Sequence, residues 1–321
     1  MSASPQLPEA GTVADAPRGN WVDRFAPPAT RPYLRLSRAD RPIGTWLLLI
    51  PCWWGIALAA ASTGGFTRWD VWLAVSCAAG AFLMRGAGCT WNDITDRDFD
   101  AAVARTKSRP IPSGQVTVRR AVVWMVAQAL LAACILFSYN GTAIALGVGS
   151  LALVAIYPFA KRFTWWPQAF LGLAFNWGAL LAWAAHGAAL SLAPVLLYAA
   201  GIAWTLFYDT IYAHQDKEDD ALIGVKSTAR LLGNHTGVGL ALFMIAAVLL
   251  MTAAALLALP PLLDPVALVL ALAGVWAFGW HMTLQMRRLK PDDPVSCLAV
   301  FRSNRDAGLI PALFLAAAAL V

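Results

Sequence analysis

The sequence predicts an all-α membrane protein, and two observations carry that prediction. Of the 321 residues, 59% are hydrophobic and 13% are charged, and the mean hydropathy is +0.61. A soluble domain has about 25% charged residues. The apolar stretches are unbroken and mostly about 17–22 residues long, as in helices that cross about 30 Å of hydrocarbon. A membrane barrel would instead show alternating segments of about 10 residues. We therefore expect a polytopic bundle of about nine transmembrane helices in a lipid bilayer.

Nine segments fit this description, and the last is short for a complete span. They are residues 43–61, 71–91, 121–139, 142–159, 166–185, 192–212, 238–259, 266–285 and 309–321. Residues 1–32 are rich in Pro and Ala and have no apolar run, so we expect a disordered cytoplasmic tail ahead of one transmembrane domain at 33–321. We expect no secretory signal there, and the acidic residues of the tail are atypical of a mitochondrial transit peptide.

Basic residues lie almost entirely on one side of the predicted membrane. Of the 24 Lys and Arg, 22 lie in the N-terminal segment or in the loops that follow even-numbered spans. Arg68 lies on the other side, and Arg85 lies within a span. The positive-inside rule makes the basic side cytoplasmic, so we expect a multi-pass protein of the bacterial inner membrane with its N-terminus and long loops in the cytoplasm. The net charge of +6 reports this topology, and no nucleic-acid partner is expected.

Half of the 18 acidic residues lie in two windows, 92–100 and 209–220, each directly after an even-numbered span. Helical geometry of about 100° per residue sorts them into faces. One face of the first window collects Asn92, Asp93, Asp96 and Asp100. One face of the second collects Asp209, Asp216 and Asp220. Asp98 and Glu218 point away from these faces.

Two stripes of carboxylates would repel each other without a counter-ion, and such oxygens are the ligands of hard cations. Mg²⁺ takes one or two carboxylates and completes its shell with water and substrate phosphates. The two windows therefore predict a diphosphate site bridged by Mg²⁺. Solvated loop charges, or the vestibule of a divalent-cation transporter, are the alternatives. A transporter would place ionisable residues near the bilayer midplane, whereas here they cluster at one face.

Basic residues near the two windows are candidates for binding the diphosphate, because a leaving anion needs cations as well as metal. They are Lys107, Arg109, Lys161, Arg162 and Lys226. Topology alone could also account for them. Arg85 is a stronger candidate for a catalytic role, because a charge within a span is costly and usually functional.

The two windows carry the resemblance to a known family. Asn92–Asp100 is similar to the N-D-x-x-D-x-x-x-D signature of the UbiA family of membrane prenyltransferases, and Asp209–Asp220 is similar to that family's D-x-x-Y-A-x-x-D-x-x-D-D. Further runs resemble the family at residues 38–46, 84–89, 157–162 and 224–229. The closest subgroup prenylates 4-hydroxybenzoate in ubiquinone biosynthesis.

The resemblance implies a bundle of helices around a central cavity that opens sideways to lipid. The first metal-binding motif of the family would match Asn92, Asp96 and Asp100. The second would match Asp209, Asp216 and Asp220. Asp96, Asp100, Asp209 and Asp216 would thus take part in catalysis with Mg²⁺. Tyr212, within the second motif, is a candidate for contact with substrate.

The implied reaction transfers a prenyl group from a polyprenyl diphosphate to the aromatic ring, ortho to the phenol hydroxyl. Arg38 or Arg41, at the entry to the first span, would hold the carboxylate of 4-hydroxybenzoate. Haem, a chlorophyll precursor or a naphthoate are alternative acceptors within the superfamily. A CDP-alcohol phosphotransferase is disfavoured because its D-G-x-x-A-R signature is absent from the sequence.

Overall fold

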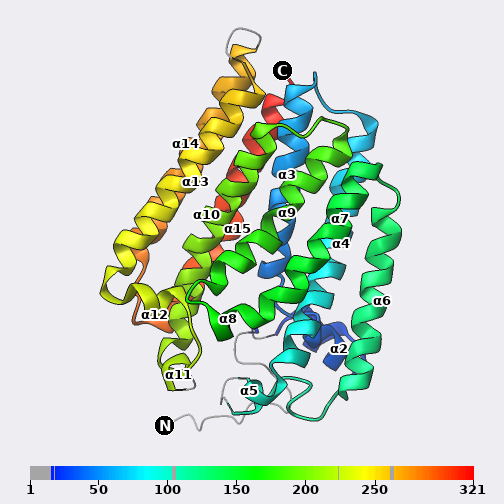
Figure 1. The fold of residues 1–321 in the computed structure, drawn as a ribbon, viewed down its shortest axis with the longest axis vertical. Coiled ribbons are helices and arrows are strands. Elements are labelled where there is room, and N and C mark those ends of the chain that lie inside the picture. Colours follow the sequence, from blue (N-terminus) through cyan, green and yellow to red (C-terminus); the bar gives the residue numbers. More distant parts are fainter. Residues whose placement is uncertain (1–15, 18, 103–105, 223, 261–263) are drawn as a thin grey trace. The chain divides into compact units, whose positions relative to one another are not determined.

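The computed structural model describes residues 16–17, 19–102, 106–222, 224–260 and 264–321, and these residues form helices and no strand (Figure 1). Eight of the described helices are long and apolar enough to cross a membrane. The chain divides into two compact units. Unit 1 comprises Met1–Gly44 and Phe82–Cys134, and unit 2 comprises Thr45–Ala81 and Ile135–Val321.

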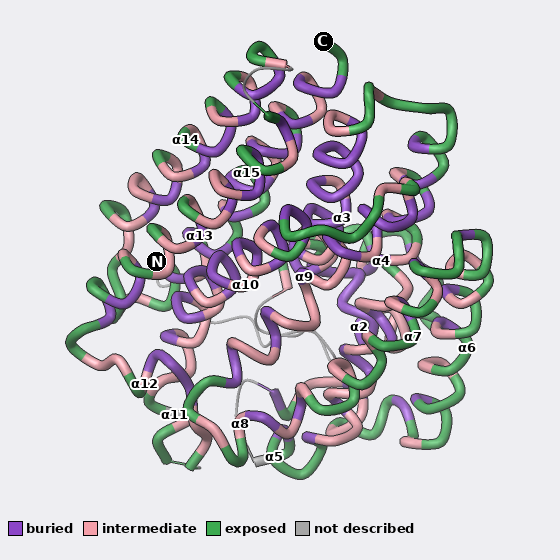
Figure 2. Tube along the Cα trace, turned by 45° about the horizontal axis from the view of Figure 1, so that its top comes forward, coloured by how far each residue is buried: buried purple, intermediate pink, exposed green. Residues whose placement is uncertain are grey.

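Unit 1 holds the short N-terminal helices, the end of one long helix and one further span. Its helices are α1 (Trp21–Phe25), α2 (Arg31–Leu36), the part of α4 (Arg68–Thr95) from Phe82 onward, α5 (Arg97–Ala102) and α6 (Val118–Leu136). Figure 2 shows that little of α6 is buried, and its buried residues are Ala121, Gln128 and Ala132. The other residues of α6 are exposed or half-buried.

Order begins earlier in the chain than the composition suggests. Val22 of α1 is fully buried, and the Trp21 indole donates a hydrogen bond to the Ala39 carbonyl at 2.7 Å. Asn20 caps α1 through its side chain. The expected disordered tail therefore has to be corrected from about Asn20 onward, and residues 1–15 and 18 lie outside the described residues.

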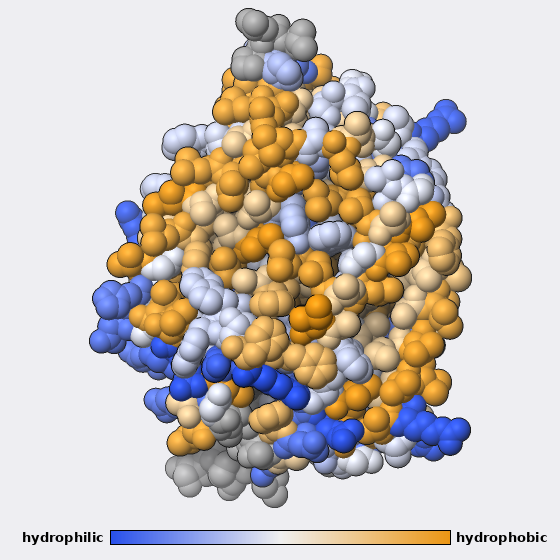
Figure 3. All heavy atoms as spheres, viewed as in Figure 1, coloured by the Kyte–Doolittle hydropathy of each residue, from blue (hydrophilic) through white to orange (hydrophobic). Residues whose placement is uncertain are grey.

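Unit 2 contains the other helices. They are α3 (Ile43–Ser62, from Thr45), the first part of α4, α7 (Gly141–Ile156), η1 (Tyr157–Phe159), α8 (Ala160–Phe163), α9 (Pro167–His186), α10 (Leu192–Ala213), η2 (His214–Asp216), α11 (Lys217–Leu222), α12 (Thr228–Leu232), η3 (Gly233–His235), α13 (Thr236–Ala258), α14 (Pro265–Arg288) and α15 (Pro294–Ala318). α10 packs against α9, α13 and α15. Apolar side chains cover α13 and α14, and hydrophilic ones gather near α11 and α12 (Figure 3).

Local sequence signals explain where the helices of unit 2 begin and end. Asn140, Asp264 and Asp293 each accept a hydrogen bond from a backbone N–H of the first turn that follows, which satisfies donors that have no partner within the helix. Pro follows the cap of α14 and of α15, at a position where its missing N–H costs nothing. Gly187 ends α9 with a φ of 104°, a left-handed conformation that favours glycine.

Aromatic side chains form the core of unit 2. The Trp204 ring on α10 lies 5.0 Å from Trp54 on α3, 5.9 Å from Phe278 on α14 and 5.1 Å from Tyr208 one turn further along α10. Lipid gives helices no hydrophobic reason to associate, so close van der Waals packing of this kind holds them together. This core fixes the direction in which α10 delivers its carboxyl end.

The last helix is longer than the sequence predicts. Residues 309–321 were expected as the ninth segment, but α15 begins at Pro294 and has 25 residues. Asn304 is fully buried within this helix, and its polar atoms have partners. Its Oδ1 accepts a hydrogen bond from the Trp204 indole at 2.9 Å, and its amide donates to the Val300 carbonyl at 3.1 Å. Charged residues in the first half of α15 lower its hydropathy, so the apolar pattern alone did not predict where this helix begins.

Candidate active site

The first acidic window of unit 1 continues the helix of α4. Asp96 donates its backbone N–H to the Asn92 carbonyl at 2.9 Å, and Asp100 donates to the Asp96 carbonyl at 2.8 Å. The spacing of one turn therefore persists across the break between α4 and α5, which keeps Asn92, Asp96 and Asp100 on one face. Asp93, Asp96 and Asp100 are buried. The Asp98 side chain is 89% exposed and lies beside Arg97, as the helical spacing predicts.

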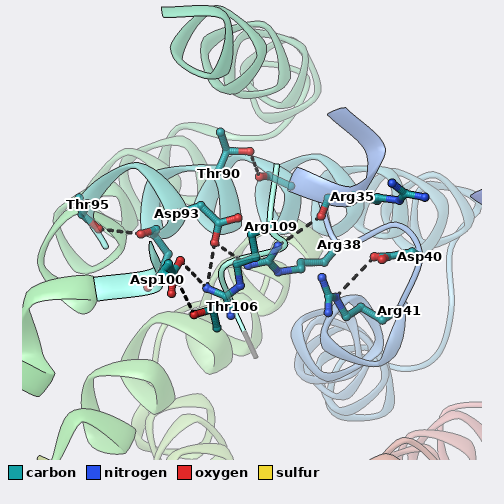
Figure 4. A network of polar contacts seen from close by, with 12 residues as sticks. Arg35, Arg38, Asp40, Arg41, Thr90, Asp93, Thr95, Asp100, Thr106 and Arg109 are labelled. Carbon is teal, nitrogen blue, oxygen red and sulfur yellow. Dashed lines mark hydrogen bonds and ion pairs between the residues drawn. The ribbon is translucent and has the colours of Figure 1, made fainter. Parts of the chain in front are cut away.

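Two arginines converge on the buried carboxylate of Asp93 (Figure 4). Arg38 Nη2 lies 2.5 Å from Asp93 Oδ1, and Arg109 Nη1 lies 3.4 Å from the same oxygen. Arg109 Nη1 also lies 2.7 Å from Asp100 Oδ2. Arg109 therefore links the start of the acidic window to its end, and Asp93 links Arg109 to Arg38.

The other basic residues predicted in unit 1 differ in their surroundings. Arg41 is buried and its Nε lies 3.5 Å from Asp40 Oδ1. The Arg85 guanidinium lies so close to the backbone of Gly44 that a Cβ there would meet it at 2.5 Å. Lys107 is exposed. The structure thus brings Arg38 and Arg109 onto the acidic window and leaves Lys107 in solvent.

Burial dominates the protonation of Asp100. It raises the pKa of this carboxyl above its usual value, and the negative charges of Asp93 and Asp96 act in the same direction. The Arg109 guanidinium opposes the shift and only partly offsets it. A cation placed among these carboxylates would stabilise their charged form.

The donor set of the first window fits Mg²⁺. It offers carboxylate and amide oxygens, and Asp93 Oδ2 is buried with no hydrogen-bond partner among the described residues. Those residues hold no ready-made group of three or more His, Cys, Asp and Glu side chains for a metal ion. Mg²⁺ does not need one, because it keeps several waters and uses substrate phosphates as ligands.

The second acidic window lies at the carboxyl end of α10 in unit 2. Asp209 is in α10, Asp216 ends the 3₁₀ turn η2, and Asp220 is in α11. The helix tightens at η2, so the regular 100° spacing assumed from the sequence does not hold strictly beyond Ala213. Glu218 is exposed, as its predicted face requires. The two windows belong to different units, and their facing one another stays a prediction.

Tyr212 and its neighbours hold the end of α10. The Tyr212 ring lies 4.5 Å from the ring of Phe301 on α15. His214 is buried, with Nδ1 2.8 Å from the Thr210 carbonyl, and Thr210 Oγ1 lies 2.6 Å from Thr228 Oγ1 on α12. These contacts fix α10 to α12 and α15 directly beside Asp209.

The predicted basic residues of unit 2 meet at a pair of loops. Lys226 donates its backbone N–H to the Lys161 carbonyl at 3.2 Å, and its ammonium lies 5.9 Å from the centre of the Trp165 ring. Arg162 lies over the Phe159 ring at 5.1 Å. Lys161 and Lys226 therefore come together, and Arg162 is directed to an exposed position.

Sequence reasoning missed the polar residues that support Arg38. Ser37 and Gln128 are buried and hydrogen-bonded to each other, with 2.9 Å between Ser37 Oγ and Gln128 Oε1. A signal for Gln128 was available, because it is the one Asn or Gln in the apolar segment 121–139, and polar side chains within spans usually pair. Nothing local marks Ser37, since its partner is 91 residues away.

Comparisons with known proteins point to one family. Residues 48–306 match the model of the UbiA prenyltransferase family. The chain is 47% identical over 295 residues to the mitochondrial 4-hydroxybenzoate polyprenyltransferase of Rattus norvegicus, covering 90% of this chain and 75% of the relative. Identity to the Homo sapiens protein of the same name is 46% over 294 residues, covering 89% and 74%.

A solved structure shares the fold. The structure of a UbiA homolog from Archaeoglobus fulgidus, bound to GPP and Mg²⁺, superimposes with a TM-score of 0.66 at 20% identity. The match covers 90% of this chain and 100% of that one.

Proposed function

Because the chain belongs to the UbiA prenyltransferase family, we propose that it transfers a polyprenyl group from a polyprenyl diphosphate to the ring of 4-hydroxybenzoate in ubiquinone biosynthesis. The observation that carries this proposal is the identity to curated 4-hydroxybenzoate polyprenyltransferases over nearly the whole chain. Both acidic windows are complete in this sequence.

Mg²⁺ is the cofactor that we assign to the site, where its charge would neutralise that of the departing diphosphate. The residues that would hold it are Asn92, Asp96 and Asp100 in unit 1 and Asp209, Asp216 and Asp220 in unit 2. Asp93 belongs to this set through Oδ2, which has no hydrogen-bond partner among the described residues, while its Oδ1 contacts Arg38 and Arg109. It places these two cations beside the reacting groups.

The remaining steps fall to the chain's own residues. The C–O bond of the prenyl diphosphate breaks, and the diphosphate leaves with the electron pair. The ring carbon ortho to the hydroxyl forms the new C–C bond and loses its proton. Arg109, Lys161 and Lys226 bind the diphosphate, and Arg85 adds a further positive charge. The apolar bundle excludes water, which would otherwise capture the allylic cation.

Arg38 is the residue that we assign to the carboxylate of 4-hydroxybenzoate. Its guanidinium is buried, is held by Asp93, and belongs to the same unit as the first acidic window. A guanidinium carries several N–H donors in a fixed fork, so it can serve Asp93 and a substrate carboxylate together. Arg41, which lies beside Asp40, is the second candidate.

We place the protein in the bacterial inner membrane with the active site on the cytoplasmic side. The distribution of basic residues supports the cytoplasmic side, because 22 of the 24 Lys and Arg lie in the N-terminal segment and the loops expected on that side. The relatives described above are mitochondrial. Fractionation of the native host therefore decides the membrane.

The decisive experiment is an assay with purified protein in detergent. Incubation with Mg²⁺, a prenyl diphosphate and 4-hydroxybenzoate should yield the prenylated acid, detected by mass spectrometry. EDTA should abolish turnover, and added Mg²⁺ should restore it. Full activity in EDTA would contradict the assigned cofactor. Uptake of divalent cations into liposomes without any prenylation would overturn the assigned function.

A further inference from the structure

The chain turns sharply between α2 and the first span, and Arg38 lies at the turn. The Ala39 N–H bonds to the Leu34 carbonyl at 3.0 Å, and the Arg38 N–H bonds to the Arg35 carbonyl at 3.1 Å. This pair of bonds is the Schellman motif, which places its C′ residue in a left-handed conformation and usually uses glycine there. Arg38 has a φ of 56° and is the one non-glycine residue with positive φ among those that the structure describes.

A strained arginine persists only where its surroundings determine the backbone. The surroundings here include a closed ring of hydrogen bonds between the end of α2 and α6. The Trp124 indole donates to Ser37 Oγ at 2.8 Å, Ser37 Oγ donates to Gln128 Oε1 at 2.9 Å, and the Gln128 amide donates to the Trp124 carbonyl at 3.3 Å. We call Ser37 and Gln128 the clamp. Both clamp residues are buried.

α4 closes the clamp from another side. A Cβ built on Gly86 would lie 2.0 Å from Gln128 Oε1 and 3.0 Å from Ser37 Cβ, so only a glycine lets the helix approach this closely. Gly86 directly follows Arg85. Ser37 is therefore held between α4 and α6 through its side chain, and Arg38 is the next residue along the chain.

We propose that Ser37 and Gln128 are positioning residues for the acceptor: they fix the strained backbone of Arg38 so that its guanidinium meets the carboxylate of the aromatic substrate. This inference rests on the proposed function, in which Arg38 binds that carboxylate. The clamp touches neither substrate. It acts by holding Arg38 against Asp93 in the geometry that the carboxylate of the aromatic substrate requires. The buried side of α6, which carries Gln128, therefore serves the selection of the acceptor.

The test compares acceptors that differ in charge. Gln128→Leu and Ser37→Ala remove the clamp bonds, and Trp124→Phe removes only the indole donor and keeps a ring against Tyr33, whose ring centre lies 5.5 Å away. The KM for 4-hydroxybenzoate should rise on the order of 10-fold to 10²-fold, since small misplacements cost this much. The KM for the prenyl diphosphate should change by less than about threefold, because the groups that bind it are intact.

Two further readouts separate positioning from general damage. The ratio of kcat/KM for 4-hydroxybenzoate to that for neutral 4-hydroxybenzamide should fall in the clamp variants, and calorimetry should show weaker binding of the acid without turnover. Ser37→Thr keeps the hydroxyl and should retain most of the wild-type ratio. Gln285→Leu is the matched control, because buried Gln285 donates to Ser303 Oγ at 2.7 Å within unit 2, and it should leave the ratio unchanged.

The outcomes distinguish this inference from the proposed function. If Arg38→Ala lowers the acid-to-amide ratio and the folded variants of Ser37, Gln128 and Trp124 keep it, the clamp inference is overturned and the role of Arg38 stands. If Arg38→Ala also keeps the wild-type ratio, the carboxylate assignment itself fails. If the acid-to-amide ratio falls equally in Gln285→Leu, the effect of the clamp variants comes from general loss of packing, and the inference is overturned.

Discussion

Arg38 combines an unfavourable backbone with a favourable ion pair, and substitutions can separate the two. Arg38→Ala and Arg38→Gly both remove the contact with Asp93, so both should be less stable than the wild type. Glycine relieves the left-handed strain that alanine retains. We expect Arg38→Gly to be about 1 kcal/mol more stable than Arg38→Ala, measured by unfolding in detergent. Equal stability of the two variants would show that the turn carries no strain.

The acidic residues should divide by helix face rather than by sequence neighbourhood. Asp96→Asn and Asp209→Asn remove charges assigned to Mg²⁺ and should each lower the rate on the order of 10²-fold or more. Asp98→Asn and Glu218→Gln alter exposed side chains and should change the rate by less than about tenfold. Steady-state prenylation measures all four, with expression checked in membranes.

Either of two results would revise the site. If Asp98→Asn is as inactive as Asp96→Asn, the face assignment of the first window is wrong. A near-normal rate for Asp209→Asn would remove the second window from the metal site.

At the scale of helices, two glycines should respond to alanine with opposite signs. Gly201 on α10 faces Asn176 of α9, and a Cβ there would lie 2.2 Å from Asn176 Oδ1. Gly201→Ala should therefore destabilise the protein by about 1–3 kcal/mol. Gly80 lies within α4 with nothing near its Cβ position, so Gly80→Ala should stabilise by about 0.5–1 kcal/mol. Thermal unfolding compares the two, and a stabilised Gly201→Ala would refute the close approach of α9 and α10.

The helices differ in how far the sequence predicts them. Unbroken apolar runs located eight spans, because length and hydropathy suffice when lipid is the solvent. The start of α15 at Pro294 was missed, since Arg302, Arg305 and Asp306 interrupt its apolar pattern. The buried Asn304 of α15 accepts a hydrogen bond from the indole of Trp204, 100 residues away in the sequence. Hydropathy does not register a partner that is distant in sequence.

For the whole molecule, the charge asymmetry gives a topology that can be tested directly. Single cysteines at 115 and 290, introduced after the native cysteines are replaced by Ala, should resist a membrane-impermeant thiol reagent in whole cells. A cysteine at 141 should react, because the charge distribution places the start of α7 on the opposite side. All three positions are exposed, so burial does not confuse the result. The reverse pattern would turn the active site away from the cytoplasm.

The sequence predicts which residues belong to the candidate site better than it predicts which of them contact one another. Spacing and family resemblance together identified both acidic windows and the nearby basic residues, because carboxylates one turn apart are visible in the sequence. The joining of Arg38 and Arg109 through Asp93 spans 55 and 16 residues, and only the fold brings them together. The same holds for Ser37 and Gln128, whose hydrogen bond depends on a close approach at Gly86.

The interleaving of the two units along the chain has a consequence for biosynthesis. Unit 1 is complete once the ribosome has passed Cys134, whereas Thr45–Ala81 of unit 2 must wait for segments that begin at Ile135. At a synthesis rate of roughly 5–20 residues per second, that delay lasts seconds. The contact of Arg38 with Asp93 can therefore form while Trp54 still awaits Trp204 and Phe278. The nascent protein acquires its first acidic window before the aromatic core that supports the second exists.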